Sequence, residues 1–345
     1  MKRRSFLKSG LIGLGALIGG RAAELLPTAM AQDTGESGVL DISGAIMNVH
    51  DPVMIKHADY YYLYHTGAGI PMKRSPDMRT WRVARGGTAF FGNPEEVFAW
   101  VPGAADIWAP DISYWNGRYH LYYSVSTFGS SRSAIGLATN LSLDFADPNY
   151  EWVHHGIVVK SDHDTNWNAI DANLALDADG MPWLVFGSHW SGIKMIRLDY
   201  ETGLQSTEDD TLYDIAARAE SPRAIEAPFI IRKGDYYYLF VSFDQCCNGI
   251  HSTYNVRVGR SESITGPYVD RDNVSMMEDG GTQILWSQGR WRGPGHNAIF
   301  SEDGSDYIVY HAYDQVQGGT PTLRIATLLW DDGGWPYVPG MGPEA

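Results

Sequence analysis

A short pattern of residues recurs five times after residue 50, and it limits the possible folds more than any other property of the sequence. In each copy, a short apolar strand is followed by a polar turn and then by a strand rich in aromatic residues. The copies recur at intervals of 55 to 69 residues, which leaves room for a four-stranded sheet and its loops. They open at Asp51, Ala109, Asp171, Glu226 and His296, and their aromatic strands cover residues 60–65, 119–124, 182–187, 236–241 and 306–311.

Each copy predicts a β-hairpin, because turn residues such as Asn116-Gly117 separate its two strands. A solenoid or a pair of sandwiches would also repeat, but the intervals are too long for common solenoids and no linker divides the chain. Antiparallel sheets of this size suit radial packing, which hides most sheet edges. The 12 Trp, 20 Tyr and 11 Phe favour strands as well. We therefore predict an all-β, five-bladed β-propeller, with one short helix candidate at residues 211–219.

The N-terminal residues 1–31 are interpreted as a twin-arginine signal peptide. Arg3-Arg4 precedes Phe6-Leu7-Lys8, the apolar run at residues 10–20 is too short to span a bilayer, and Ala29-Met30-Ala31 offers a cleavage site. The mature chain, residues 32–345, is expected to be a single propeller domain in the periplasm or outside the cell. An uncleaved N-terminal anchor is the alternative.

The formal net charge of −15 narrows the range of partners. An acidic surface repels phosphate backbones and anionic membranes, so we expect no nucleic acid partner and, after removal of the signal, no membrane partner. A neutral polysaccharide meets no such barrier. We expect the protein to be a monomer.

The only two cysteines, Cys246 and Cys247, are adjacent in the sequence. We interpret them as two partly buried, small apolar residues, because a vicinal disulfide requires a strained local geometry. Such a bond remains the alternative in an oxidising compartment.

Three of the five copies open with an acidic residue, namely Asp51, Asp171 and Glu226. In a propeller the first strand of each blade lines the central channel, so these carboxyl groups should converge. Crowded carboxylates shift one another's pKa values, and one protonated and one ionised carboxyl group are what glycoside hydrolysis requires. The alternative is that each acid only forms a turn at the start of a strand. Asp111 is displaced from the equivalent position and is expected either to cap a turn or to bind backbone instead.

The sequence resembles the arabinan-degrading members of glycoside hydrolase family 43 over about residues 45–340. The matching segments are residues 50–52, 106–112, 124–129, 168–171, 225–229, 243–248, 252–255 and 293–297. The resemblance implies a five-bladed propeller and hydrolysis with inversion. It also implies that Asp51 is the general base, Glu226 the general acid, and Asp171 the carboxylate that orients the sugar and raises the pKa of the acid. One departure is Ala172, where relatives often have Pro.

The resemblance also implies a metal ion in the channel, usually calcium, with a histidine and water molecules around it. His311, at the end of the fifth aromatic strand, fits that position. From the residues alone, a buried histidine with its hydrogen bonds satisfied is the commoner interpretation, and calcium prefers oxygen ligands.

Sugar binding requires flat apolar faces and hydrogen-bonding groups. Trp108 and Phe128 are candidates for stacking on a sugar ring, although both could serve only in packing. Asn168 and Ser188 are candidates for hydrogen bonds to sugar hydroxyls.

We expect endo-hydrolysis of α-1,5-linked arabinan, because no further domain is expected after the fifth copy to block one end of a groove. An exo-acting α-L-arabinofuranosidase, exo-arabinanase or β-xylosidase is the alternative within the same fold. A non-catalytic carbohydrate-binding propeller is the alternative of another class.

Overall fold

The computed structural model describes residues 38–219 and 221–341, and these form five antiparallel four-stranded sheets, one of which gains a short fifth strand. Blade I contains β2 (Val53–His57), β3 (Tyr60–Tyr64), β4 (Pro71–Ser75) and β5 (Thr80–Thr88). Blade II contains β6 (Trp108–Trp115), β7 (Arg118–Val125), β8 (Ser133–Asn140) and β9 (Val153–Ser161). Blade III contains β10 (Asn173–Leu176), β11 (Pro182–Phe186), β12 (Ile193–Arg197) and β13 (Tyr213–Ala216).

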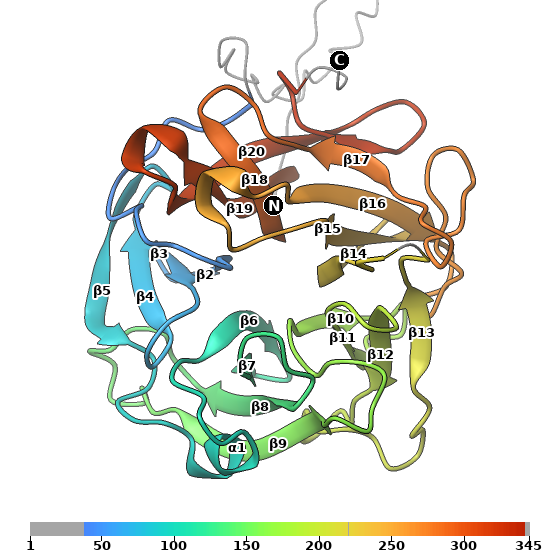
Figure 1. Ribbon diagram of the computed structural model, residues 1–345. Helices are drawn as coiled ribbons and strands as arrows, with labels where there is room; N and C mark the ends of the chain where they lie inside the picture. The colour runs from blue at the N-terminus through green and yellow to red at the C-terminus, as the bar shows by residue number, and fades with distance from the viewer. Residues whose placement is uncertain (1–37, 220, 342–345) are drawn as a thin grey trace, which may run out of the picture. The chain divides into compact units, whose positions relative to one another are not determined.

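Blade IV contains β14 (Ile225–Lys233), β15 (Tyr236–Phe243), β16 (Asn255–Ser261) and β17 (Thr282–Leu285). Blade V contains β18 (Trp291–Glu302), β19 (Ser305–Asp314), β20 (Thr320–Trp330) and β21 (Pro336–Tyr337). The first strand of each blade contacts the first strands of both neighbouring blades, so β2, β6, β10, β14 and β18 form a closed inner ring (Figure 1). The predicted five-bladed β-propeller is confirmed.

The aromatic strands explain why the blades adhere to one another. Along β3, Tyr62 and Tyr64 pack between blades I and II, whereas Tyr61 and Leu63 pack between blades V and I. Successive side chains of a strand point to opposite faces of its sheet, and here both faces are covered. Each of the five hydrophobic clusters accordingly joins two adjacent blades.

The segment before β2 closes the ring without a covalent bond. The Leu40 N–H donates to the Ile325 carbonyl at 2.8 Å, and the Gly38 carbonyl accepts from the Thr327 N–H at 2.8 Å, so this segment lies along β20 of blade V. A few residues later, β1 (Ser43–Gly44) pairs with the outermost strand of blade I, β5. This closure could not be predicted from the sequence, because the segment lies outside the repeats.

Two expectations about helices were wrong. Residues 211–219 contain the strand β13 rather than a helix, because backbone pairing with β12 and packing of Tyr213 on Trp183 outweigh the local pattern. A short helix that was not predicted, α1 (Glu95–Trp100), lies between blades I and II, and two single-turn 3-10 helices occur at Gly249–His251 and Gln315–Gln317.

The predicted signal peptide, residues 1–31, lies outside the described residues. Within the described part of the chain, no helix is long and apolar enough to cross a membrane.

We predict that Leu63→Ala lowers the free energy of unfolding by about 2–5 kcal/mol, because it leaves a cavity between blades V and I. Urea unfolding of the wild type and the variant measures the difference. Val83→Ala, on the exposed side of β5, is the control and should change stability by less than about 0.5 kcal/mol. A loss below about 1 kcal/mol for Leu63→Ala would show that the ring interface tolerates the cavity.

Candidate active site

All five first strands share one backbone feature. One non-glycine residue, within the strand or just before it, adopts a left-handed conformation, which L-residues seldom adopt. These residues are Asp51, Ala109, Asp171, Ala227 and His296, with φ angles of 52°, 41°, 61°, 53° and 46°. In β6, β14 and β18 the register with the next strand shifts at this point, as in a β-bulge.

The backbone N–H of each left-handed residue donates to a side chain of the preceding blade. Buried N–H groups need such partners, so these bonds join each blade to the next. The five pairs are Asp51 with His311 Nδ1 (3.1 Å), Ala109 with Thr66 Oγ1 (2.8 Å), Asp171 with Ser124 Oγ (3.0 Å), Ala227 with Asp171 Oδ2 (3.1 Å) and His296 with Ser242 Oγ (2.9 Å). We call these five contacts the inter-blade hydrogen bonds.

The left-handed residues correct one detail of the sequence analysis. Glu226 does not occupy the position of Asp51 and Asp171, because Ala227 is the left-handed residue of blade IV. Glu226 lies one residue earlier, where blade I has His50 and blade II has Trp108. A bulge leaves no clear sequence signature, so aligning the acids directly placed Glu226 one residue out of register.

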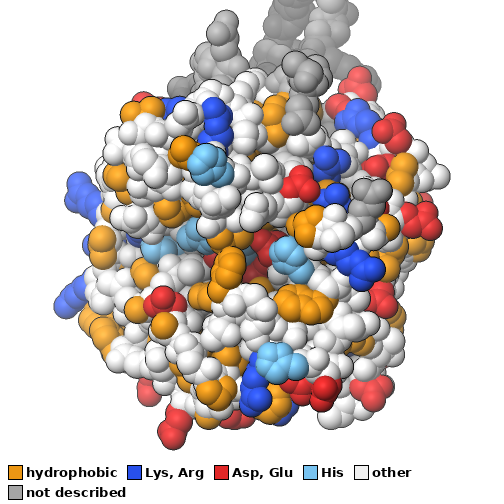
Figure 2. Space-filling view, viewed as in Figure 1, with side chains coloured by type: hydrophobic (Ala, Val, Ile, Leu, Met, Phe, Trp, Pro, Cys, Tyr) orange, Lys and Arg blue, Asp and Glu red, His pale blue; other side chains and the backbone are white. Residues whose placement is uncertain are grey.

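The three predicted carboxyl groups nevertheless share one buried region. The side chains of Asp51 and Asp171 are buried, and that of Glu226 is 12% exposed. The negative charges of Glu226 and Asp51 both act on Asp171. Figure 2 shows acidic and histidine side chains near the centre of the molecule's face, with hydrophobic side chains around them. The convergence that the repeats predicted is therefore present.

Asp51 is surrounded by hydrogen-bond donors. Its Oδ1 lies 2.8 Å from His50 Nδ1 and 3.1 Å from His296 Nδ1, and its Oδ2 accepts from the Thr66 hydroxyl at 2.5 Å. Burial would raise the pKa of Asp51, but the nearby charges of His296 and His50 and the hydrogen bond from His50 hold it well below its usual range. Asp51 is therefore ionised at neutral pH.

Asp171 has the opposite electrostatic character. Burial, followed by the charges of Glu226 and Asp51, raises its pKa well above the ordinary value, despite the hydrogen bond from Ala227 N–H. The carboxyl group of Asp171 therefore keeps its proton to higher pH than that of Asp51. Two carboxyl groups whose pKa values shift in opposite directions thus lie in the same site.

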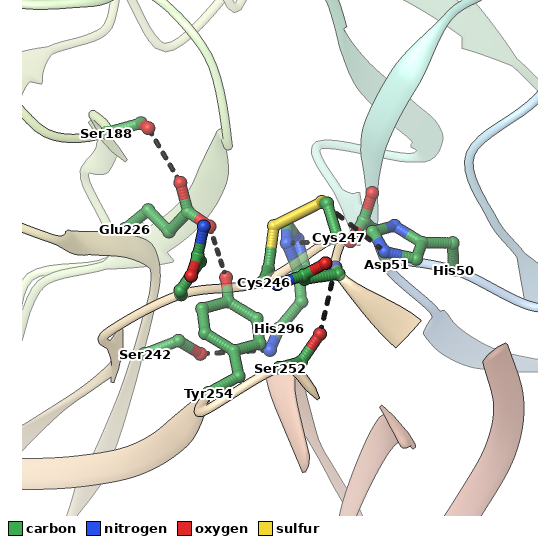
Figure 3. The surroundings of a disulfide bond; sticks show 12 residues. His50, Asp51, Ser188, Glu226, Ser242, Cys246, Cys247, Ser252, Tyr254 and His296 are labelled. Carbon is green, nitrogen blue, oxygen red and sulfur yellow. Dashed lines mark hydrogen bonds and ion pairs between the residues drawn. A yellow bond between two sulfur atoms is a disulfide. The ribbon is translucent and has the colours of Figure 1, made fainter. Parts of the chain in front are cut away.

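Both carboxylate oxygens of Glu226 are held by hydroxyl groups. Ser188 donates to Oε2 at 2.7 Å and Tyr254 donates to Oε1 at 2.7 Å (Figure 3). The loop that follows β11 is fixed beside β14 by an isolated bridge between Ser188 and Glu226. Glu226 is therefore positioned by two different blades.

The other sequence-predicted residues lie in varied surroundings. Trp108 is half-buried at the start of β6, and Phe128 lies in the loop after β7 with 84% of its surface exposed. Asn168 is buried, and its Oδ1 accepts from the Ser133 hydroxyl at 2.6 Å. The role of each in sugar binding, like that of Ser188, stays a prediction. Asp111 binds backbone as expected, accepting from the Leu174 N–H at 2.9 Å.

The interpretation of the cysteines was wrong. Cys246 and Cys247 form a vicinal disulfide, and Cys247 is exposed rather than part of an apolar interior. In Figure 3 this bond lies between Glu226 and the Asp51–His50 pair. The oxidised turn is held by tertiary contacts that the sequence does not reveal.

Sequence reasoning assigned no role to His50, Thr66, Tyr254, His296 or Tyr313. A usable signal existed for Thr66, which lies three residues after Leu63 of its aromatic strand. The same position, three residues after Leu121, Leu184, Leu239 and Ile308 of the other four aromatic strands, is occupied by Ser124, Gly187, Ser242 and His311. Gly187 has no side chain to offer, and in its blade Asp171 supplies the inter-blade hydrogen bond.

His311 was predicted as a metal-binding residue, and its surroundings are compatible with that role. It is fully buried, and among the described residues its Nε2 has no hydrogen-bond partner. Both polar side-chain atoms of Asn297 are also buried without partners in that part of the chain. His50, Asp51 and His311 form a group whose potential ligand atoms lie within 4.8 Å of one another. Buried polar atoms of this kind bind ordered water or ions.

A propeller whose centre brings three carboxyl groups together, with the pKa of Asp51 lowered and that of Asp171 raised, has the features of an acid–base hydrolase of glycosidic bonds. Comparison with known proteins agrees with this class. Residues 45–336 match the family model described as glycosyl hydrolases family 43. The chain belongs to this family and is a glycoside hydrolase.

Three relatives illustrate the similarity. The extracellular endo-α-(1→5)-L-arabinanase 1 of Bacillus subtilis is 44% identical over 84% of this chain and 87% of its own. The extracellular exo-α-(1→5)-L-arabinofuranosidase ArbA of Cellvibrio japonicus is 41% identical over 85% and 86%. The solved structure of Cellvibrio cellulosa α-L-arabinanase complexed with arabinohexaose has a TM-score of 0.81 and 40% identity, covering 85% of this chain and 96% of that one.

We predict that Thr66→Val lowers kcat by about 10-fold or more, because the Thr66 hydroxyl both orients Asp51 and accepts the Ala109 N–H. The lost bonds should also cost about 1–3 kcal/mol of stability. Kinetics and urea unfolding on the same preparations measure both effects.

Thr66→Ser is the matched control, since it keeps the hydroxyl and should restore most of the kcat. A serine variant as slow as the valine variant would mean that the methyl group, rather than the hydrogen bonds, is what matters.

Proposed function

We propose that the enzyme hydrolyses α-1,5-linked L-arabinofuranosyl bonds within arabinan, with inversion of the anomeric configuration. The observation that carries this proposal is the shared region of Asp51, Asp171 and Glu226, in which the pKa values of Asp51 and Asp171 shift in opposite directions. The substrate is supported by the Bacillus subtilis relative, whose name states endo-α-(1→5)-L-arabinanase activity. The related Cellvibrio structure that holds arabinohexaose supports it as well.

Asp51 acts as the general base. Its Oδ1 is occupied by His50 and His296, whereas Oδ2 receives a single hydrogen bond, from Thr66. A free lone pair on Oδ2 therefore remains for the attacking water, whose proton moves to Asp51 as the oxygen bonds to the anomeric carbon. The low pKa of Asp51 keeps it ready to accept that proton at neutral pH.

Glu226 acts as the general acid and delivers a proton to the leaving glycosidic oxygen. The hydroxyls of Ser188 and Tyr254 fix the carboxyl group in one orientation. Asp171 supports this step through the hydrogen bond that it accepts from the N–H of Ala227, the residue next to Glu226. In an inverting reaction, acid and base work from opposite sides of the sugar ring.

The sugar contacts are assigned to Trp108, Phe128, Asn168 and Ser188. Phe128 offers an exposed flat face for a sugar ring, and the Ser188 oxygen retains a lone pair for a sugar hydroxyl.

We propose that calcium binds in the channel beside His311, which would contact it through the water molecules of its coordination shell. Because His311 Nδ1 accepts the Asp51 N–H, the neutral ring carries its proton on Nε2, which suits a hydrogen bond to a metal-bound water. When bound, the ion supplies positive charge beside the carboxyl groups. Treatment with EDTA should lower the melting temperature, and added calcium should restore it; an unchanged melting temperature would argue against the ion.

We propose that residues 1–31 direct export by the twin-arginine route, so that the mature protein works in the periplasm or outside the cell, as a monomer. The names of the Bacillus subtilis and Cellvibrio japonicus relatives, both extracellular, support export. N-terminal sequencing of the secreted protein tests the cleavage after Ala31.

Product analysis on linear arabinan separates endo from exo action. The endo proposal predicts a ladder of oligosaccharides early in the reaction. Release of a single small product from the first minutes would instead favour exo action, as the name of the Cellvibrio japonicus relative suggests. Detecting the anomer of the new reducing end by NMR in the same experiment tests inversion.

Glu226→Gln should lower kcat by about 10²- to 10⁴-fold, because the amide cannot donate the catalytic proton. The variant should still bind arabino-oligosaccharides, as calorimetry would show. Glu302→Gln is the control, since Glu302 pairs with Lys56 at the end of the β18 hairpin, away from the site. A Glu226→Gln variant that hydrolyses arabinan at the wild-type rate would exclude the proposed acid.

A further inference from the structure

The Cys246–Cys247 disulfide lies in the loop between β15 and β16, beside the catalytic carboxyl groups. Cys247 is exposed and Cys246 is half-buried. In Figure 3 the sulfur atoms lie between Glu226 and Tyr254 on one side and Asp51 and His50 on the other. Sequence reasoning gave this bond no role.

The loop that carries the disulfide is tied to itself on both sides of the bond. The Thr253 N–H donates to the Gln245 carbonyl at 2.9 Å, and the Asn248 N–H donates to the Ser252 hydroxyl at 3.0 Å. Between these ties, Cys247 has a φ angle of 62°, in the left-handed region that non-glycine residues disfavour. The covalent ring formed by two adjacent bonded cysteines restricts how this turn can relax.

A chain of hydrogen bonds runs from the turn to Asp51. The Cys247 N–H donates to the Tyr313 hydroxyl oxygen at 2.8 Å, and that oxygen lies 2.8 Å from His50 Nε2. On the other side of the ring, His50 Nδ1 lies 2.8 Å from Asp51 Oδ1.

The direction of these bonds follows from their donors. The Tyr313 oxygen accepts the Cys247 N–H, so its own proton can point to His50 Nε2. If Nε2 of a neutral His50 accepts this hydrogen bond, the ring carries its single proton on Nδ1, the nitrogen that faces Asp51. A doubly protonated His50 also has a proton on Nδ1. In both charge states, the ring donates to Asp51.

We propose that the Cys246–Cys247 disulfide is a positioning element for the general base, acting on Asp51 through Tyr313 and His50. This inference rests on the proposed role of Asp51 and adds a redox dependence to it. If the bond opens, the Cys247 turn can leave its left-handed conformation and its N–H moves away from Tyr313. His50 then loses the contact that fixes its orientation toward Asp51.

Reduction by dithiothreitol provides a direct test. The dithiol transfers two electrons and two protons to the bond, so that two protein thiols form and the reagent closes to its cyclic disulfide. Because the chain has only two cysteines, a change in kcat that results from reduction of a disulfide must come from this pair. We expect kcat to fall by about 10-fold with KM unchanged, and reoxidation to restore it. Titration of two thiols per chain confirms that the bond has opened.

If the bond resists the reagent, a double variant that carries Cys246→Ser and Cys247→Ser allows the protein to be compared with and without the disulfide. Its kcat should match that of the reduced wild type and should not respond to dithiothreitol. Circular dichroism and the melting temperature establish that each form is folded.

Tyr313→Phe tests the route of the effect, since it removes only the hydroxyl. We expect it to lower kcat by a similar factor and to abolish the further loss on reduction, because the two changes interrupt the same chain of contacts. Tyr337→Phe, on the exposed part of β21, is the control and should respond to dithiothreitol as the wild type does.

Three outcomes would overturn the inference: an unchanged kcat after the bond has opened, a change in KM alone, or a Tyr313→Phe variant that is still slowed by reduction. Asp51→Asn, measured in parallel, keeps the two proposals separate. If Asp51→Asn is inactive while reduction has no effect, only the role of the disulfide is excluded. If Asp51→Asn remains active, the proposed base itself is wrong.

Discussion

The arrangement of the site depends on how buried N–H groups at the starts of the first strands are satisfied. A left-handed residue in each strand turns its N–H away from the neighbouring strand, and an unpaired N–H in the interior would be costly. The preceding blade supplies the acceptor in every case. The same contacts that hold the blades in order therefore also place Asp51, Asp171 and the backbone next to Glu226. The fold and the arrangement of the candidate site depend on the same five hydrogen bonds.

Charge is distributed unevenly over this frame. The imidazole groups of His50 and His296 contact Asp51, whereas Asp171 faces Glu226 and a backbone N–H. The two aspartates occupy equivalent backbone positions, yet their pKa values shift in opposite directions. Repetition of the blade gives the acids equivalent positions, and the difference in their neighbours gives them different chemistry.

The five copies, their hairpin turns and the convergence of Asp51, Asp171 and Glu226 could be predicted from the sequence, because each depends on patterns local to one repeat. The one-residue offset of Glu226 could not, since a bulge depends on pairing with the next strand. His50 and Tyr313 escaped notice because the contact between them joins two different blades. The disulfide was misjudged for the same reason, since the contacts that hold its turn come from the loop and from β19.

The closure of the ring by the segment near Leu40 has a kinetic consequence. Its partner on β20, Ile325, lies near the other end of the chain, so this pairing carries a large loop-closure entropy and is expected late in folding. Until it forms, β20 presents unpaired backbone groups that another molecule could capture.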